Sequence, residues 1–283
     1  MDLIPQFPTV AYYETTCSSS YILCMHKHPE ILEILLITAG EGEFYIDGKR
    51  YPIEAGDVIV CDAGSVHDIL PSKGGPWATS CIGLTNVNIS GLKENCLLPV
   101  GAPTKYRAES IFFELNSIAK LIDCHIDTQN KRSGFLCSCL GQVILEILLD
   151  NIENIAPIKI PKNQDFIDAA LKYVEQHYTG DVTLNDVAKE FHMTAYYFSH
   201  LFKKCIGYPF MQYVIRRRIG EAQSLLMNTT LGITEVASIS GFPDSSHFSK
   251  LFVKHVGISP QKYRTYRGKK AKGLTPDYKK FPS

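Results

Sequence analysis

The nine residues "SHLFKKCIG" (199–207) recur as "SKLFVKHVG" (249–257), fifty residues further along the chain. In both copies the large apolar side chains fall three and four positions apart, which is the spacing of one face of an α-helix. The lysines and histidines fall on the remaining positions. Similarity at a fixed offset indicates that one small structural unit is built twice. The sequence therefore predicts two related helical units in the C-terminal part of the chain.

Each copy follows a shorter helical stretch and a tight turn. The stretch "TLNDVAKEFHM" (183–193) starts with a capping-box pattern, and "ITEVASISGFP" (233–243) contains the same Val-Ala pair, which leaves room for a crossing helix. Gly241 suits the sharp turn, because glycine adopts backbone conformations that are strained for other residues. The expected N-caps are Thr183, Thr194 and Asp244. A short helix, a turn and a longer basic-faced helix form a helix-turn-helix unit, which the sequence thus predicts twice.

One long helical segment, "PFMQYVIRRRIGEAQSLLMN" (209–228), joins the two units. A helix of about 18 residues is about 27 Å long, and successive major-groove faces of a DNA duplex lie about 34 Å apart. A rigid connector of this length would hold both basic-faced helices against adjacent major grooves. The alternative is a helical repeat that binds nothing.

The net charge of zero conceals an asymmetry between the two parts of the chain. Residues 1–163 contain 12 Lys and Arg against 19 Asp and Glu, a balance of −7, and residues 164–283 contain 17 against 10, a balance of +7. Two solvated surfaces of opposite charge would also account for these two charge balances. A basic C-terminal part with three consecutive arginines, 216–218, is also typical of a domain that binds a polyanion.

The composition excludes several classes of protein. The 283 residues suffice for two domains, and 45% hydrophobic with 20% charged residues is typical of a soluble globular protein. We find no secretory start and no apolar run of about 18 residues, so we expect a cytoplasmic protein with no membrane partner. The nine cysteines are an odd number without a CxxC pair, so neither a zinc finger nor a disulfide framework is expected.

The N-terminal part reads as a β-domain followed by two helices. Up to about residue 90, short apolar runs alternate with turn residues, and Asp47-Gly48 is a strong hairpin signal, so we expect an antiparallel barrel or sandwich. From about residue 107 the apolar spacing becomes helical in "AESIFFELNSIAKLIDCHI" (108–126) and "SGFLCSCLGQVILEILLDNI" (133–152). The apolar faces of these helices either only cover the sheet or also form a dimer contact.

The segment "GFPDSSHFSKLFVKHVGISPQKYR" (241–264) resembles the signature of the arabinose-operon regulator family of bacterial transcription factors (AraC/XylS). Every position of the pattern Gly-Phe-x-Asp-x-Ser-x-Phe-Ser-x-x-Phe-x4-Gly-x-x-Pro-x-x-Tyr-Arg is filled. The connecting segment is similar to the family's connecting helix, except that Gly220 stands where a better helix former is usual, a departure expected to soften the connector. The resemblance covers about 100 residues and implies two helix-turn-helix units that read adjacent major grooves.

Carried over onto this sequence, the family pattern implies two groups of DNA-contacting residues. Lys donates to guanine, Ser contacts either kind of base, and Tyr packs against the thymine methyl group or donates to phosphate. The expected base contacts are Tyr196, Ser199, His200, Ser245, Ser246, Ser249 and Lys250. The expected phosphate contacts are Lys203, Lys204, Arg218 and Lys254. Arg216 and Arg217 are left open between DNA contacts and plain solvated charges.

The N-terminal part also carries a resemblance of its own. His26, His28 and Glu33 are spaced as HxHx4E, and His67 closes a second motif, "GDVIVCDAGSVH". These motifs resemble those of cupins, and in cupin enzymes the four side chains bind a divalent metal. The second motif departs from the cupin pattern, because Asp62 replaces the usual Pro and no Asn follows three residues after His67.

Three roles stay open for these side chains: ligands of a divalent metal, polar residues of an effector pocket, or structural histidines. The incomplete second motif argues against a metal, and no cofactor is expected; if a metal binds, its ligands are His26, His28, Glu33 and His67. The predicted effector-pocket residues are His26, His28, Glu33, Tyr45, His67 and Trp77.

Together these patterns predict a multidomain α+β protein. It comprises a cupin-like effector-binding and dimerisation domain (1–150), a linker (151–163), a double helix-turn-helix domain (164–267) and a basic tail (268–283). The expected function is sequence-specific regulation of transcription under the control of a small-molecule effector, with an activator and a carbohydrate favoured by family habit alone. The expected partners are promoter DNA, RNA polymerase and a second copy of the chain. The alternative is a metal-dependent cupin enzyme fused to a DNA-binding module.

Overall fold

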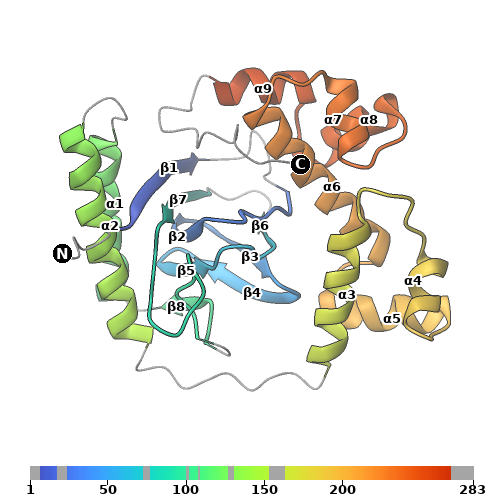
Figure 1. Cartoon of the computed structure of the whole chain (residues 1–283), viewed down its shortest axis with the longest axis horizontal. Coiled ribbons are helices and arrows are strands. Elements are labelled where there is room, and N and C mark those ends of the chain that lie inside the picture. Colours follow the sequence, from blue (N-terminus) through green and yellow to red (C-terminus); the bar gives the residue numbers. More distant parts are fainter. Residues whose placement is uncertain are drawn as a thin grey trace, which may run out of the picture.

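The fold is given by a computed structural model, which describes residues 7–17, 24–72, 77–99, 102–107, 109–126, 131–152 and 163–268. A β-domain lies between two groups of helices, with α1 and α2 on one side and α3 to α9 on the other (Figure 1). The predicted α+β class, with a β-domain followed by an all-helical domain, is confirmed. Most of the predicted linker (151–163) and tail (268–283) lies outside the described residues, so the domain boundaries stay predictions.

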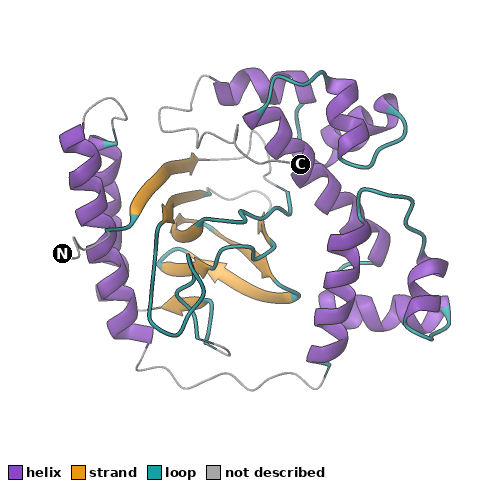
Figure 2. Ribbon diagram, in the orientation of Figure 1, coloured by secondary structure: helices purple, strands orange, loops and turns teal. Residues whose placement is uncertain are grey.

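The β-domain consists of two antiparallel sheets, drawn in orange in Figure 2. The five-stranded sheet has the order β1-β7-β2-β5-β8, and the three-stranded sheet has the order β4-β3-β6. The strands are β1 (Thr9–Cys17), β2 (Leu32–Ala39), β3 (Glu41–Ile46), β4 (Lys49–Glu54), β5 (Asp57–Cys61), β6 (His67–Pro71), β7 (Ala78–Thr85) and β8 (Lys105–Arg107). Asp47 and Gly48 join β3 to β4 with positive φ angles of 43° and 83°, which confirms the predicted two-residue hairpin turn.

The side chains of the central strands alternate between the interior of the β-domain and its outer surface. In β2, Leu35 and Ile37 face the interior, where they pack in one core with Phe44 of β3. Ile34 and Leu36 point the other way and belong to the core beneath α1 and α2. The alternation therefore gives the five-stranded sheet two apolar faces, one for each core.

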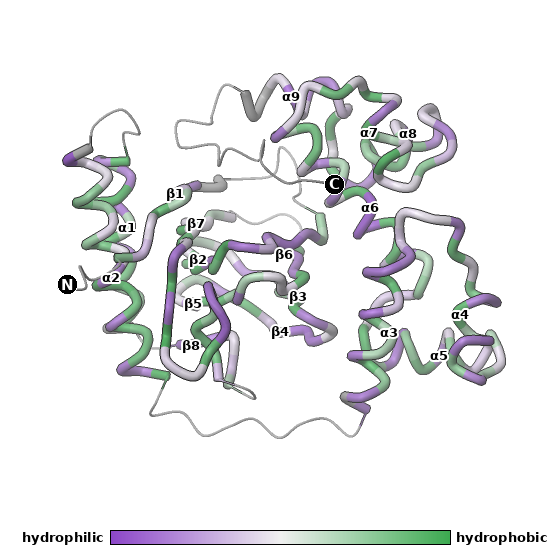
Figure 3. Tube along the Cα trace, in the orientation of Figure 1, coloured by the Kyte–Doolittle hydropathy of each residue, from purple (hydrophilic) through white to green (hydrophobic). Residues whose placement is uncertain are grey.

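Helices α1 (Glu109–His125) and α2 (Lys131–Ile152) form the layer over the five-stranded sheet. Leu115 of α1 and Ile144 of α2 are fully buried there, so the two predicted amphipathic helices are confirmed and one face of each covers the sheet. Figure 3 shows that α2 is largely apolar. Among the described residues it is the one helix whose length and composition would allow it to cross a membrane, and its buried face belongs to this core.

The chain from residue 163 to 268 forms the two predicted helix-turn-helix units, α4–α5 and α7–α8. The helices are α3 (Gln164–His177), α4 (Leu184–Glu190), α5 (Ala195–Ile206), α6 (Phe210–Asn228), α7 (Ile233–Ile239), α8 (Ser245–Val256) and α9 (Pro260–Gly268). The predicted N-caps are confirmed, because Thr183, Thr194 and Asp244 each accept a hydrogen bond from a backbone N–H in the first turn of the following helix.

The sharp turn inside each unit contains one residue in the left-handed region. In the second unit this residue is Gly241, with φ of 89°, as predicted. In the first unit it is His192, with φ of 53°. Residues other than glycine rarely adopt this conformation, so a turn is usually predicted from a glycine. The sequence therefore predicted the position of the left-handed residue in the second unit but not in the first.

Each unit has an aromatic core, and α6 contributes to both cores. Phe198 and Phe202 of α5 are buried with Phe210 of α6. Phe248 of α8 is buried with Ile219, which lies further along α6. The connecting helix is therefore a structural part of both units and not a spacer between them.

Two of the three consecutive arginines of α6 are buried. Arg216 is 8% exposed and Arg217 is 2% exposed. The Nε of Arg217 donates to Glu175 Oε1 at 2.7 Å, and the Nε of Arg216 donates to Asp68 Oδ2 in β6 at 2.7 Å. The sequence left these arginines open between DNA contacts and solvated charges, and both alternatives are wrong because each guanidinium is paired with a carboxylate inside the protein.

Candidate nucleic-acid interface and barrel site

Helix α5 presents a polar side to solvent. Because Phe198 and Phe202 are fully buried, the side chains on the opposite side of the helix point outward. Tyr196 is 83% exposed. The accessible side holds every contact residue predicted in α5, namely Tyr196, Ser199, His200, Lys203 and Lys204. The structure thus brings together the side chains with which the first unit is expected to contact DNA.

Helix α8 repeats this arrangement in the second unit. Ser246, Lys250 and Lys254 are exposed, and Ser245 and Ser249 are half-buried. The Ser249 hydroxyl donates to the Ser245 carbonyl at 2.9 Å, so it is tied to the helix backbone. Both recognition helices therefore keep their predicted lysines accessible, and no described part of the β-domain buries them.

Arg218 is engaged elsewhere. Its Nε donates to the Tyr178 carbonyl at 2.5 Å and its Nη2 to the Gly180 carbonyl at 2.7 Å. The guanidinium also lies 5.8 Å from the ring centroid of Phe242. This arrangement disagrees with the phosphate contact predicted for Arg218, because its donors hold the turn after α3. We therefore leave Arg218 out of the proposed DNA-contacting residues.

The second site lies inside the β-domain, where four predicted side chains meet. Glu33 comes from β2, His67 from β6, and His26 and His28 from the segment that pairs with β6 through an isolated bridge. Their potential ligand atoms all lie within 4.8 Å of one another. His67 Nε2 is 2.8 Å from Glu33 Oε2, and His28 Nε2 is 3.5 Å from Glu33 Oε1.

Backbone carbonyls orient two of the histidines. His26 Nδ1 lies 2.9 Å from the Cys24 carbonyl, and His67 Nδ1 lies 3.0 Å from the Ser65 carbonyl. A carbonyl only accepts, so both Nδ1 atoms carry a proton and both Nε2 atoms remain for the cluster. This orientation is the one that metal-binding histidines adopt.

The protonation states differ within the cluster. Burial lowers the pKa of His26 well below its ordinary value and that of His28 to about 3, and the charge on His67 adds to both shifts. Burial also acts to lower the pKa of His67, but the Glu33 carboxylate raises it above the ordinary value. The cluster therefore combines two neutral imidazoles with an imidazolium–carboxylate pair, which suits hydroxyl groups. A divalent cation would bind only with loss of the Nε2 proton of His67.

Tyr12 belongs to this site although it was not among the predicted pocket residues. Its hydroxyl donates to Glu33 Oε1. The close approach depends on Gly83, because a Cβ there would lie 2.4 Å from the Tyr12 ring. A sequence signal existed in the alternation of β1, but only the pairing of β1 with β7 shows which side of the strand faces Glu33.

The two remaining predicted pocket residues, Trp77 and Tyr45, lie in different parts of the structure. Trp77 is 8% exposed and packs in the interior core of the β-domain, in the same core as Phe44, whose ring lies 6.2 Å from His67. Tyr45, the neighbour of Phe44 in β3, points outward and packs against Tyr213 of α6. The pocket role predicted for Tyr45 is therefore wrong in this structure, because its side chain lies between the two domains.

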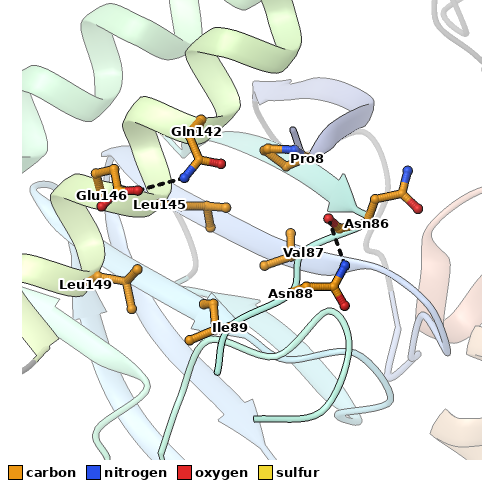
Figure 4. A pocket seen from close by; sticks show the side chains of 9 residues that line it. All are labelled: Pro8, Asn86, Val87, Asn88, Ile89, Gln142, Leu145, Glu146 and Leu149. Atoms are coloured by element: carbon orange, nitrogen blue, oxygen red, sulfur yellow. Dashed lines mark hydrogen bonds between the residues drawn. The ribbon is translucent and has the colours of Figure 1, made fainter. Parts of the chain in front are cut away.

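A separate pocket lies between α2 and the loop after β7 (Figure 4). Gln142 donates to Glu146 at 2.7 Å across one wall, and the Asn88 amide donates to the Asn86 carbonyl at 3.5 Å on the other. None of the predicted effector residues lines it. The histidine cluster therefore remains the candidate effector site.

A β-domain with a buried polar cluster, joined to two helix-turn-helix units, defines a transcription regulator that carries its own sensor domain. The family model "AraC-like ligand binding domain" matches residues 11–132, and the family model "Helix-turn-helix domain" matches residues 187–266. The chain belongs to the AraC/XylS family and is a DNA-binding transcription regulator under effector control, as the sequence predicted.

Two of the similar proteins cover most of the chain, and a third covers about a third of it. The "Uncharacterized HTH-type transcriptional regulator YdiP" of Escherichia coli (strain K12) is 28% identical over 248 residues, which is 84% of this chain and 80% of that protein. The "Lactose operon transcription activator" of Staphylococcus xylosus is 26% identical over 232 residues, 81% of this chain and 82% of that protein. The "Melibiose operon regulatory protein" of Escherichia coli (strain K12) is 34% identical over 101 residues, 36% of this chain and 33% of that protein.

Among solved structures, ToxT from Vibrio cholerae strain SCE256 bound to an unsaturated fatty acid is 16% identical. It covers 91% of this chain and 92% of its own length, with a TM-score of 0.48.

Proposed function

We propose that the chain reads DNA with α5 and α8 in adjacent major grooves. The observation that carries this proposal is the equivalence of the two helices, each held by a buried aromatic core on one side and exposing its predicted lysines on the other. Because α6 belongs to both cores, the two recognition helices are presented as one rigid reading surface.

Base readout is tested on α8 with two neighbouring lysines. A duplex selected by the wild-type chain from a randomised pool serves as the probe, with single-base variants for comparison. Lys250→Ala should cost about 1–3 kcal/mol of binding and relax the preference at one base position. Lys254→Ala, on the same helix, should weaken every sequence alike and reduce the salt dependence of binding, because a phosphate contact releases counterions. Equal weakening on all duplexes by Lys250→Ala would refute base readout by this residue.

For the effector, we propose a small polar molecule bound at His26, His28, Glu33 and His67, with Tyr12 as a further contact. The imidazoles and the carboxylate pair suit hydroxyl groups, and a carbohydrate is supported by the lactose and melibiose operons in the names of two similar proteins. A thermal-shift screen of sugars on the full chain tests this. His28→Ala should abolish the shift, and an unchanged shift in that variant would place the sugar elsewhere.

A divalent metal at the same cluster is the second candidate. The arrangement fits one once His67 loses its Nε2 proton, because three imidazole Nε2 atoms and the Glu33 carboxylate then converge as ligands. A metal there would supply a Lewis acid at the centre of the β-domain. Elemental analysis of the purified chain separates the two candidates. Stoichiometric metal together with turnover of an added substrate would favour the cupin-enzyme alternative. The similar proteins named above, in contrast, are regulators.

We further propose that the chain is a homodimer that acts in the cytoplasm as an activator, placing four recognition helices beside a promoter and assisting RNA polymerase. The side of α1 and α2 turned away from the sheet supports the dimer, because it exposes large apolar side chains. These are Phe113, Leu121, Phe135, Leu136 and Val143. Apolar surface of this kind marks protein contacts.

Sedimentation velocity tests the dimer. Phe113, which is 73% exposed, should yield monomers when replaced by Asp, because a charge would then lie in the apolar contact. Lys189→Asp, an exposed substitution on α4 of the helical domain, is the control and should leave the dimer intact. A wild-type monomer, or a Phe113→Asp dimer, would contradict this contact.

A further inference from the structure

The pocket between α2 and the loop after β7 is a cavity with a volume of about 240 Å³. In Figure 4, Gln142, Leu145 and Glu146 lie on α2 opposite the side chains of the loop. The volume is that of about eight water molecules in the liquid, and it is smaller than the volume of pockets that hold drug-sized ligands. An occupant of this pocket must therefore be a compact molecule.

The walls of the pocket are held in place from behind. The Val87 N–H donates to Asn95 Oδ1 at 2.9 Å, and the Asn95 N–H donates back to the Val87 carbonyl at 2.8 Å. On the side of α2, Gly141 allows the helix to approach the sheet closely. A Cβ at this glycine would lie 3.2 Å from Leu84 Cδ2 and 3.5 Å from Pro8 Cγ. The pocket is therefore formed by packing and hydrogen bonds of the protein itself.

The inner surface of the pocket is apolar. Val87 is 1% exposed and Leu145 is 4% exposed, and Ile89 and Leu149 line the pocket with them. None of the described residues that line the pocket is aromatic. Because burial against such side chains removes apolar surface from water, the pocket suits a ligand with a small aliphatic body.

The rim of the pocket presents oxygen atoms. Gln142 Nε2 donates to Glu146 Oε1 at 2.7 Å. Asn88 Nδ2 donates to the Asn86 carbonyl at 3.5 Å, and Asn86 Nδ2 donates to Thr9 Oγ1 at 3.0 Å. A carboxylate and a carbonyl only accept, so two of these pairs fix the orientation of the Gln142 and Asn88 amides. The side-chain oxygens that accept no hydrogen bond from any described residue are Gln142 Oε1, Asn86 Oδ1, Asn88 Oδ1 and Glu146 Oε2.

We propose that this pocket binds a small primary amine with an aliphatic body. An ammonium group carries three N–H donors and a positive charge, which match a set of oxygen acceptors that includes the Glu146 carboxylate. An anion is disfavoured, because no described residue that lines the pocket is a lysine or an arginine. A quaternary ammonium group has no N–H to donate and is recognised by aromatic rings, which the described lining lacks.

This site is separate from the histidine cluster, and its ligand goes beyond the proposed function. The acceptors come from two elements, since Gln142 and Glu146 belong to α2, and Asn86 and Asn88 belong to the loop after β7. A bound ammonium group would therefore join α2 to the loop. Val143, next to Gln142, is one of the exposed apolar residues of the proposed dimer contact, so the amine would bind to the helix that carries this contact.

Three molecules with the same branched body test the class of ligand on the full chain. Isopentylamine is the cationic probe, isopentanol is neutral, and isovalerate is anionic. Weak binding is expected, because Glu146 is exposed and water screens an exposed charge, so ligand-observed NMR titration is the suitable measurement. Isopentylamine should bind at least about fivefold more tightly than isopentanol, and isovalerate should bind most weakly.

Variants of Glu146 test the place of binding. Glu146→Gln removes the charge and should weaken isopentylamine at least about fivefold, and Glu146→Lys should abolish binding because an ammonium group of the chain itself then lies at the rim. Glu146 is exposed, so both variants should fold, which circular dichroism checks. Glu114→Gln, at an exposed position of α1 outside the pocket, is the matched control and should retain the wild-type affinity.

Hydrogen exchange of the wild-type chain gives a second measure of the place. With isopentylamine at ten times its Kd, exchange should slow by up to about tenfold in residues 86–89 and 142–149, and it should not change in residues 26–28 of the histidine cluster.

Equal affinities for isopentylamine and isopentanol, or wild-type affinity in Glu146→Gln, would overturn the proposal. Slower exchange in residues 26–28 instead of 86–89 would place the amine in the histidine cluster and would overturn it as well. None of these results bears on the binding of the selected duplex, so the proposed function would stand or fall separately.

Discussion

The Arg216–Asp68 pair allows a prediction whose size follows from its burial. Burial raises the pKa of Asp68 above its ordinary value of 3.8, and Arg216 opposes this shift. In Arg216→Met the opposing charge is gone, while a side chain of similar length fills the space. Asp68 is then a carboxylate with no exposed surface and no ion-pair partner, and only the Tyr208 hydroxyl at 3.5 Å and the charge of His67 still favour its ionised form. The chain must therefore either protonate Asp68 or separate the two domains.

The free energy of protonating Asp68 sets the upper limit of the stability that Arg216→Met loses. Holding an aspartate neutral at pH 7, when its unfolded-state pKa is about 3.9, costs about 4 kcal/mol, and at pH 5 about 1.5 kcal/mol. The sign is fixed by the direction of the shift: a raised folded-state pKa means that the folded form takes up the proton first, so acid relieves the penalty. Arg216→Met should therefore lose up to about 4 kcal/mol at pH 7 and recover most of it at pH 5.

Urea unfolding at the two pH values measures this loss. Trp77 is the only tryptophan of the chain and lies inside the β-domain, so its fluorescence reports that domain while circular dichroism reports the helices. The double variant Asp68→Asn with Arg216→Met should recover most of the stability at pH 7 and lose the pH dependence that Arg216→Met introduces, because no charge remains at this pair. A loss that is equal at pH 5 and pH 7, or below about 1 kcal/mol at pH 7, would refute the reasoning.

Three further predictions concern the helical domain. Phe248→Ala removes a fully buried ring from the second unit and should cost about 3–5 kcal/mol, measured by thermal and urea unfolding. Thr194→Ala removes the cap that accepts the Tyr197 N–H at 3.2 Å and should cost about 1 kcal/mol, whereas Thr194→Asp should retain the stability. Burial would raise the pKa of Glu175, but Arg217 and Lys27 lower it below its ordinary value of 4.5. The contribution of Glu175 to the stability of the fold should therefore be present above pH 4.5 and be lost in more acidic solution. In Glu175→Gln the free energy of unfolding should depend less on pH below pH 4.5, and the same dependence as in the wild type would contradict the assignment.

Local signals predicted the two helix-turn-helix units. The repeated nine residues, the caps at Thr194 and Asp244 and the turn at Gly241 depend on neighbours within a few residues, and all of them are found. The metal-like spacing of the N-terminal histidines also predicted which side chains meet, because strand alternation and a family motif agreed there.

Long-range partners account for the predictions that are wrong or disagree with the structure. The arginines at 216–218 read as a basic patch, yet their partners are a carboxylate in β6, a carboxylate in α3 and two carbonyls after α3, which no local pattern reveals. The pocket role predicted for Tyr45 is wrong for the same reason. Alternation separates Phe44 from Tyr45, but only the docking of a second domain shows that the outer side is also buried.

The sharing of α6 by two aromatic cores has a consequence for how such a regulator changes its target. One residue inserted into this helix would turn the second recognition helix by about 100° around the axis and advance it by about 1.5 Å. Insertions of two whole turns would restore the facing but lengthen the reach by about 10 Å. The distance between the two base-pair patches that the protein reads is therefore built into the connecting helix, and new binding sites are more readily acquired by exchanging outward side chains than by altering its length.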